Sequence, residues 1–397
     1  MQRSHRRVFA LAGAITLALA ATVAAAQPAP PGTPIATGLS NPRGLSAAGS
    51  DVIVAELGAG NIVRINADGE SSVVVSGLPT TTYMSAETGA EEAAGPSSAI
   101  AVDGGYVITV SEGPDAELQS VYFATEGSSS PSLLVDLGQY ERDNNTDGDT
   151  DLAGNPEFLS NPYSVIAFED GFLISNSGAN ALLRIAPDGT VSPFAVFTNR
   201  ENPLFPGLGG PTMDQVPTGV TIGPDGAVYV GTLTGFPFPS GGAVVYRVED
   251  GNGDGDALDD GEVEVYADGL TTVTDVDFDG ADLLVSEFST NMLAQAPGRV
   301  VRISGGEQEV VASGLISPTS LLVTDDGRIL VSQEFAGLVS DISDVDAGGE
   351  GTPTVPAPAD TGLGGTSEAG DSMLAVLLAA GAATLVGVSR RTTARQR

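Results

Sequence analysis

Residues 250–262 (DGNGDGDALDDGE) have the spacing of a calcium-binding loop. Alternate side chains in such a loop turn their oxygens inward toward a hard cation, and a glycine at the sixth position, here Gly255, allows a sharp bend. Position 12, where a bidentate Glu completes a calcium loop, holds Gly261, so a solvated acidic hairpin tip is the alternative. We expect Ca²⁺ to bind here and to stiffen the loop, and the candidate ligands are Asp250, Asn252, Asp254 and Asp256.

The same spacing occurs a second time at residues 142–151 (RDNNTDGDTD), with Gly148 at the sixth position. No carboxylate follows at position 12, so another part of the fold would have to complete a Ca²⁺ site. A negatively charged loop without a metal is the alternative. The candidate metal ligands of this loop are Asp143, Asn145, Asp147 and Asp149.

Polar residues also recur at corresponding ends of strand-like runs along the chain, where they could form a ring. If these loops share one face of the fold, their oxygens would suit a cation or a polyhydroxylated ligand, and neighbouring carboxylates could supply a general base. Repeat proteins also reuse turn residues for folding alone, so a structural role stays open. The run ends are Glu56, Glu112, Asn176, Thr232, Glu287 and Gln333, and Asn41 and Asn161 stand where the preceding runs begin.

The residue types that most hydrolases use are missing from the body of the chain. It has no Cys and no Lys, and its only His is His5, near the N-terminus. A Ser-His-Asp triad, a thiol nucleophile, a Schiff-base lysine and a His-ligated metal are therefore excluded. Carboxylate chemistry, oxygen-ligated cations and binding remain, and we assign no catalytic residue.

The polar run ends belong to a phrase that recurs about six times, at intervals of roughly 40–50 residues, and the two acidic loops interrupt this repeat. Each copy has a Pro or a substitute, an apolar run, an Asp-Gly-type turn and a second apolar run, as in NPYSVIAFEDGFLISN (161–176). Two further short runs follow in each repeat except the last, which stops after a third run around residues 338–342. Four strands per repeat and six repeats predict an all-β, six-bladed β-propeller over residues 35–343, with a solenoid or a sandwich as the alternative. PIATGLS (34–40) matches the ending of a fourth run, so we expect it to close the ring.

The ends of the chain predict export and anchoring. Residues 1–26 have basic residues, an apolar run and an Ala-rich cleavage site, as in a signal peptide of Sec or twin-arginine type. Residues 27–34 form a Pro-rich spacer, and residues 344–371 a disordered linker rich in Gly, Pro and Thr. The terminal segment 372–397 combines a short apolar helix (373–388) with a basic tail, which favours a membrane anchor or a sorting signal.

The charge of the chain excludes one class of partner. The net charge is −35, from 16 basic and 51 acidic residues. Seven of the arginines lie in the two terminal segments, so the body between them carries 9 − 51 = −42. Such a surface repels nucleic acid and anionic lipid. We expect an extracellular or cell-surface monomer whose partner is a small molecule, a glycan or a protein.

Two stretches resemble the ScyD/ScyE family of secreted, propeller-like bacterial proteins. They are residues 160–197 and residues 216–248, and TGFPFPSGGAVVYRV (234–248) is the most specific part. The resemblance covers about residues 35–343 and implies a six-bladed, exported protein with no assigned catalytic residues.

We therefore expect an exported, cell-surface-associated propeller that acts as a ligand- or partner-binding scaffold stabilised by Ca²⁺. The alternative is a metal-dependent lactonase or hydrolase with oxygen ligands at the channel, and a third possibility is an inert adhesion module. We expect any specific function where the copies of the repeat disagree or where their turn residues meet.

Overall fold

The computed structural model describes residues 31–84, 91–115, 117–150 and 157–345. The predicted signal peptide, almost all of the linker and the C-terminal apolar segment lie outside these residues. Within the described ranges, neither helix is long and apolar enough to cross a bilayer.

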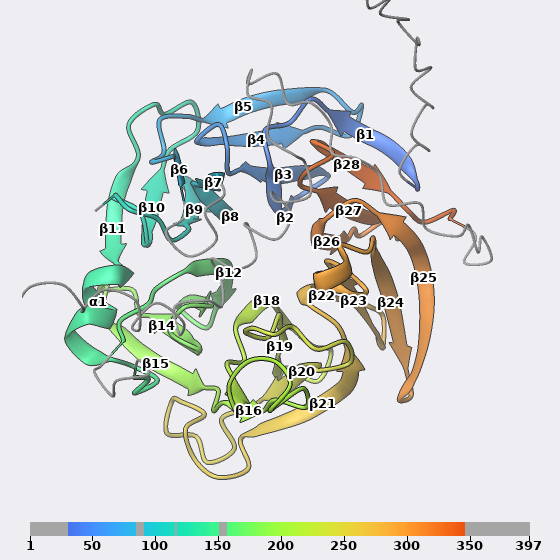
Figure 1. Cartoon of the computed structure of the whole chain (residues 1–397). Helices are drawn as coiled ribbons and strands as arrows, with labels where there is room; N and C mark the ends of the chain where they lie inside the picture. The colour runs from blue at the N-terminus through green and yellow to red at the C-terminus, as the bar shows by residue number, and fades with distance from the viewer. Residues whose placement is uncertain (1–30, 85–90, 116, 151–156, 346–397) are drawn as a thin grey trace, which may run out of the picture.

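Six four-stranded antiparallel sheets are arranged as a ring around a central axis, which we call the channel (Figure 1), and this confirms the predicted all-β, six-bladed propeller. Each blade runs from an inner strand at the channel to an outer strand at the rim. From the inside outward, blade 1 contains β2 (Pro42–Ala48), β3 (Asp51–Glu56), β4 (Asn61–Ile65) and β5 (Ser71–Val75), and blade 2 contains β8 (Pro96–Val102), β9 (Gly105–Val110), β10 (Ser120–Ala124) and β11 (Ser132–Asp136). Blade 3 contains β12 (Pro162–Phe168), β13 (Gly171–Asn176), β14 (Ala181–Ile185) and β15 (Val191–Val196), and blade 4 contains β18 (Pro217–Ile222), β19 (Val228–Thr232), β20 (Ala243–Val248) and β21 (Val263–Leu270). Blade 5 contains β22 (Val273–Asp279), β23 (Asp282–Glu287), β24 (Gly298–Ser304) and β25 (Glu307–Leu315), and blade 6 contains β26 (Pro318–Val323), β27 (Ile329–Gln333), β28 (Leu338–Asp341) and β1 (Thr33–Thr37).

The sixth blade is completed by the first strand of the chain. Strand β1 pairs antiparallel with β28, with Thr33 opposite Asp341 and Thr37 opposite Leu338. The ring closure predicted from residues 34–40 is therefore confirmed. Closure by pairing removes the open sheet edge that β28 would otherwise present.

Short additional elements decorate the connections between blades. The hairpin of β6 (Thr81–Met84) and β7 (Glu91–Ala94) precedes blade 2, and helix α1 (Leu137–Asn144) follows it. A second small hairpin, β16 (Arg200–Glu201) and β17 (Thr212–Met213), precedes blade 4, and the 3₁₀ helix η1 (Met292–Ala294) lies in blade 5.

The core is divided into layers between neighbouring blades. Strand side chains alternate between the two faces of a sheet, so each blade presents apolar residues to both neighbours. One buried cluster joins Ile53 of blade 1 to Ile108 of blade 2, and another joins Leu173 of blade 3 to Val230 of blade 4. All four of these side chains are fully buried. The apolar alternation of the repeats thus holds the blades around the channel.

Hydrogen bonds close the blade seams at one end of the channel, the end where the six inner strands begin, which we term the upper mouth. At the second residue of four inner strands, a hydroxyl donates to the first carbonyl of the next inner strand. These bonds join Ser97 to Pro162 (2.7 Å), Thr218 to Val273 (2.8 Å), Thr274 to Pro318 (2.9 Å) and Thr319 to Pro42 (3.2 Å). We refer to them as the hydroxyl ring. In blades 1 and 3 the same position holds Arg43 and Tyr163.

Replacing one hydroxyl of this ring should destabilise the propeller measurably. Thr218 is fully buried and also donates to Gly231 at 3.1 Å. Val has the same shape but no donor, so Thr218→Val would leave buried carbonyls unpaired at a cost of about 1–3 kcal/mol. Urea unfolding followed by circular dichroism measures this cost, with the exposed Thr190→Val as the control. Equal stability of the two variants would show that the ring does not hold the seam.

Candidate functional site

Most residues of the predicted polar ring cap the backbone at the upper mouth. The side chains of Glu56, Glu287 and Gln333 accept from the N–H groups of Ser40 (2.9 Å), Thr271 (2.6 Å) and Ile316 (2.8 Å). Asn176 accepts from the N–H of Asn161 at 2.7 Å. Each bond ties the end of a second strand to the segment that leads into the inner strand of its own blade. These contacts hold the loops of the mouth in place.

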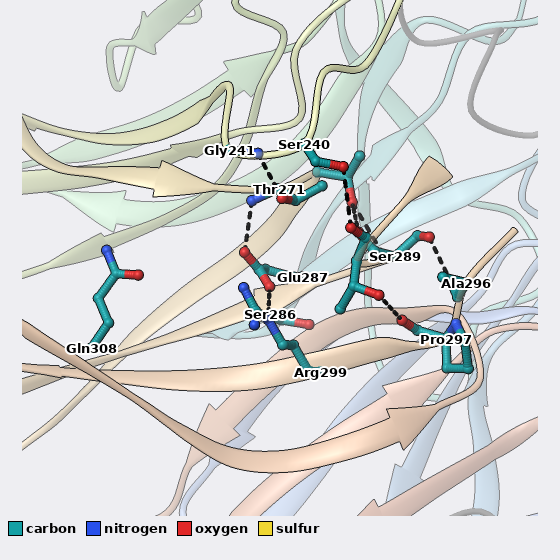
Figure 2. Close-up of polar contacts among 12 residues, drawn as sticks. Ser240, Gly241, Thr271, Ser286, Glu287, Ser289, Ala296, Pro297, Arg299 and Gln308 are labelled. Atoms are coloured by element: carbon teal, nitrogen blue, oxygen red, sulfur yellow. Dashed lines mark hydrogen bonds and ion pairs between the residues drawn. The ribbon is translucent and has the colours of Figure 1, made fainter. Parts of the chain in front are cut away.

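Glu287 shows this capping role most fully (Figure 2). Its fully buried carboxylate lies between the Thr271 N–H and the guanidinium of Arg299, with which it forms an ion pair. The Thr271 hydroxyl in turn accepts from the N–H of Gly241 at 2.9 Å. The carboxylate therefore connects β23, β24 and the segment entering β22.

Glu112 does not occupy the predicted repeat position. Strand β9 ends at Val110, and Val110 pairs with Pro96 as Glu56 pairs with Pro42. The strand-end position predicted for Glu112 is therefore wrong, because Glu112 lies two residues beyond the paired strand. Its role as a candidate ligand at the channel mouth stays a prediction. Its N–H instead donates to Asn161 Oδ1 at 3.2 Å. Spacing could have revealed the error, since the paired residues are 14 or 15 positions apart in the other blades.

The remaining predicted ring residues also make local contacts. The Asn41 and Asn161 carbonyls accept from the N–H groups of Leu57 (3.1 Å) and Ser177 (2.9 Å). The Thr232 hydroxyl donates to the Val244 carbonyl at 3.0 Å. The five confirmed run ends thus belong to the framework of the mouth, and their role as ligands stays a prediction.

The acidic loop at residues 250–262 is folded around its own carboxylates. Asp250 accepts from the N–H groups of Gly253 (2.6 Å) and Gly255 (2.9 Å), and these backbone donors lower the pKa of its carboxyl group. Glu262 closes the loop by accepting from Gly251 at 2.9 Å and Asp259 at 3.0 Å. The Asn252 amide donates to Asp254 and Asp259, whereas the Asp256 side chain accepts from Leu258.

The loop after α1 brings two of its predicted ligands together. Asp147 and Asp149 both accept from the Asn180 amide, at 3.0 Å and 3.4 Å. Burial, reinforced by the charge of Asp147, raises the pKa of Asp149. Asp143 instead accepts from Gln139 at 2.9 Å, and the Asn145 amide donates to the Asp149 carbonyl at 3.3 Å. Across the described residues, no group of three or more His, Cys, Asp or Glu is arranged to hold a metal ion.

Calcium binding by these loops stays a prediction with a direct test. If Ca²⁺ binds the folded chain, millimolar Ca²⁺ should raise the melting temperature relative to excess chelator, because a ligand that binds only the folded state stabilises it. Calorimetry of the wild type, Asp147→Asn and Asp250→Asn would show which loop responds. An unchanged melting temperature in the wild type would contradict the prediction.

The upper mouth also contains a buried charged pair that the sequence did not single out. Arg43, the second residue of β2, is 8% exposed, and Glu334, the residue after β27, is 1% exposed. Arg43 Nε lies 3.6 Å from a Glu334 oxygen, and the Arg43 guanidinium lies over the Tyr163 ring at 5.1 Å. The Arg43 carbonyl accepts from the Ser332 hydroxyl at 2.6 Å, which fixes the backbone from which the side chain extends.

The electrostatics of this pair follow from its burial. Burial raises the pKa of Glu334, and the neighbouring Arg43 counteracts that shift. Burial acts to lower the pKa of Arg43, yet the carboxylates of Glu334 and Glu112 hold it above its ordinary value. Arg43 therefore stays charged, with carboxylates and an aromatic face around it.

Tyr163 separates the charged pair from a cavity inside the channel. Its hydroxyl reaches from blade 3 to the Thr319 carbonyl of blade 6 at 3.3 Å. The cavity has a volume of about 160 Å³ and is lined by both apolar and polar residues of the inner strands. The polar residues include Ser46, Ser98, Thr221, Ser320, Asp275 and Asp277. It is large enough for several water molecules or a small ligand.

Asp275 is the most perturbed carboxylate of the cavity. One of its oxygens accepts from the Ser320 hydroxyl and from the Leu321 N–H (3.0 Å), and the other accepts from Val276 (2.9 Å). Burial raises its pKa to about 7, against the opposing effect of these donors. Asp277 similarly accepts from the Val323 N–H at 2.8 Å and bonds Thr221 at 3.3 Å. The two carboxylates thus link blade 5 to both neighbours.

Comparison with known proteins leaves the activity open. No protein-family model and no curated protein matches the chain. Among solved structures, a gluconolactonase from Xanthomonas campestris is 13% identical, covers 78% of this chain and 93% of its own, and has a TM-score of 0.48. A virginiamycin B lyase from Staphylococcus aureus is 13% identical, covers 76% of this chain and 94% of its own, and has a TM-score of 0.43. A chain of a nidogen/laminin complex is 13% identical, covers 72% of this chain and 86% of its own, and has a TM-score of 0.42. At these identities the likeness concerns the fold alone, which hosts many functions.

Proposed function

We propose that the protein is an exported, cell-surface-associated propeller of the ScyD/ScyE type that binds a ligand or partner at the upper mouth of its channel. Export and anchoring rest on the sequence of residues 1–26 and 373–388, outside the described residues. The ligand-binding role rests on the geometry of the mouth.

The observation that carries the proposal is the interruption of the hydroxyl ring. Four blades place Ser or Thr at this position and seal the seam to the next blade. Blades 1 and 3 place Arg43 and Tyr163 at this position, and the two side chains meet at 5.1 Å. At the seam after blade 3, the Ser177 hydroxyl donates to the Pro217 carbonyl instead, at 2.6 Å. Positions where a repeat departs from the pattern that its fold requires are often functional. Two large polar side chains at the second position of the inner strands therefore support a binding site.

A binding screen with the purified full-length chain tests this proposal. Thermal melting is recorded with a panel of sugars, polyols, amines and carboxylates for the wild type and for Arg43→Gln. We expect at least one compound to raise the melting temperature of the wild type and to lose most of that effect in Arg43→Gln. The proposal fails if every compound leaves the wild type unchanged, or if the variant responds like the wild type.

A hydrolase acting at the channel is the second candidate, favoured by Asp275. A carboxylate with a pKa of about 7 beside a cavity has the proton affinity that a general base needs near neutral pH. Lactone hydrolysis by the full chain, with and without Ca²⁺, tests this reading. Activity that disappears in Asp275→Asn would support it, and an inactive wild type would remove it.

A further inference from the structure

The cavity inside the channel is closed at the upper mouth and opens at the opposite end, where the inner strands finish. At the first and second positions of the six inner strands, every residue is buried. At the fifth position, all six residues line the cavity and are only half-buried. A ligand can therefore enter from this second end, which we term the lower mouth. The fifth-position residues are Ser46, Ile100, Ile166, Thr221, Asp277 and Leu322.

The charged residues of the cavity are all acidic. Asp275 and Asp277 are two residues apart on β22, so their side chains project to the same side of the strand, and both line the cavity. Among the described residues that line it, none is basic. A buried charge is costly unless it has a partner, so native structures supply one. When these two carboxyls ionise, the counter-charge has to come from solution.

Asp275 keeps an acceptor position toward the cavity. One carboxylate oxygen accepts from the Ser320 hydroxyl and the Leu321 N–H, whereas the other, Oδ1, accepts from the Val276 N–H alone. A carboxylate oxygen can accept two hydrogen bonds, so Oδ1 has one position left. The neighbouring Gly219 gives this oxygen its room, because a Cβ at that position would lie 2.0 Å from Oδ1.

The rest of the lining suits an ammonium group with a short apolar chain. An ammonium group donates three hydrogen bonds and accepts none. The hydroxyls of Ser98 and Ser164 also line the cavity and bond no other described residue, so both can accept from it. Toward the lower mouth, Ile100, Ile166 and Leu322 offer apolar surface. A calcium ion would gain nothing from these side chains and needs at least six oxygen ligands.

We propose that the lower end of the channel binds a small organic ammonium ion. The ammonium group donates to Asp275, and its apolar chain lies among the apolar side chains of the lower mouth. Asp277 adds a second negative charge near the entrance, and the net charge of −35 concentrates cations around the protein. The inference goes beyond the proposed function, since Tyr163 separates this cavity from the upper mouth.

A series of ligands of similar length tests the ligand class. Burial raises the pKa of Asp275 to about 7, so isothermal titration of the full-length chain is made at pH 8, where this carboxyl is mostly ionised. We expect n-butylamine, as its ammonium ion, to bind at least tenfold more tightly than n-butanol and butyrate. Methylamine should also bind at least tenfold more weakly, because it lacks the apolar chain. No detectable binding of n-butylamine, or equal binding of any of the other three compounds, overturns the inference.

Variants of the cavity test the residues. Asp275→Asn removes the charge and should weaken binding of n-butylamine at least tenfold. Ser164→Leu keeps the charge but fills the cavity, so it should cause a similar loss, and circular dichroism shows whether each variant is folded. The control is Asp326→Asn, which removes an exposed carboxylate after β26, outside the cavity, and should bind like the wild type. Unchanged affinity in either folded cavity variant, or an equal loss in the control, overturns the inference.

Discussion

Replacing Glu287 with Ala should lower the free energy of unfolding by at least about 1–3 kcal/mol, the cost of leaving the buried Thr271 N–H without its acceptor. The Glu287 side chain is fully buried and holds the Thr271 N–H and Arg299 at once. The variant leaves a backbone donor and a guanidinium without their acceptor. It also opens a void, because the surroundings of a deleted side chain relax only partly.

Two further variants make this measurement specific. Glu287→Gln keeps an oxygen for the Thr271 N–H but turns an amide toward Arg299. Its free energy of unfolding should therefore lie between those of the wild type and the Ala variant. Glu307→Ala, at an exposed position of the same blade, controls for loss of a carboxylate. The chain has no Trp and 8 Tyr, so tyrosine fluorescence and circular dichroism can follow the urea transition. A loss for Glu287→Ala no greater than that of Glu307→Ala would contradict the capping role.

The stability of the propeller should fall between pH 5 and pH 8 because of Asp275. Its folded pKa of about 7 exceeds the unfolded value near 3.9, so between these values the folded chain binds more protons than the unfolded chain. The contribution of Asp275 to the free energy of unfolding is therefore greatest below the unfolded pKa and is lost as the pH rises through 7. From pH 5 to pH 8 this single group should cost roughly 2–3 kcal/mol.

The effect is isolated by comparing variants across the same pH range. Asp275→Asn cannot ionise, so the difference between its unfolding free energy and that of the wild type should change by this amount. Asp326→Asn serves as the control, because its carboxyl is exposed and hydrogen bonds, first from Thr324, lower its pKa. Parallel pH profiles for the wild type and Asp275→Asn would contradict the prediction.

The architecture could be predicted from the sequence because the residues that specify each hairpin lie close together in the chain. Alternating apolar residues and Gly-containing turns specify hairpins within about 16 residues, and the match between residues 34–40 and a fourth run specified the closure confirmed by β1 and β28. The polar run ends were located correctly in five blades. Their hydrogen-bond partners were not predictable, because they depend on how the connecting segments fold back onto the blades.

The charged pair was missed for a different reason. Arg43 and Tyr163 stand at a position where four other blades have Ser or Thr, so the disagreement among the copies was visible in the sequence. Glu334 gave no such signal, because it follows β27 and nothing local indicates its burial beside a residue almost 300 positions away. Asp275 likewise resembled an ordinary polar strand residue until the neighbouring blades enclosed it.

The pairing of β1 with β28 has a consequence for biosynthesis. The ribosome makes β1 first and its partner last, so β1 must wait, unpaired, while five blades and most of a sixth are synthesised. A waiting strand is an aggregation hazard, which short length and proline reduce. Strand β1 is only 5 residues long and contains Pro34, so it is a poor template for a neighbouring chain. Because β1 pairs poorly with other chains, the nascent protein is less prone to aggregate before the last blade is available.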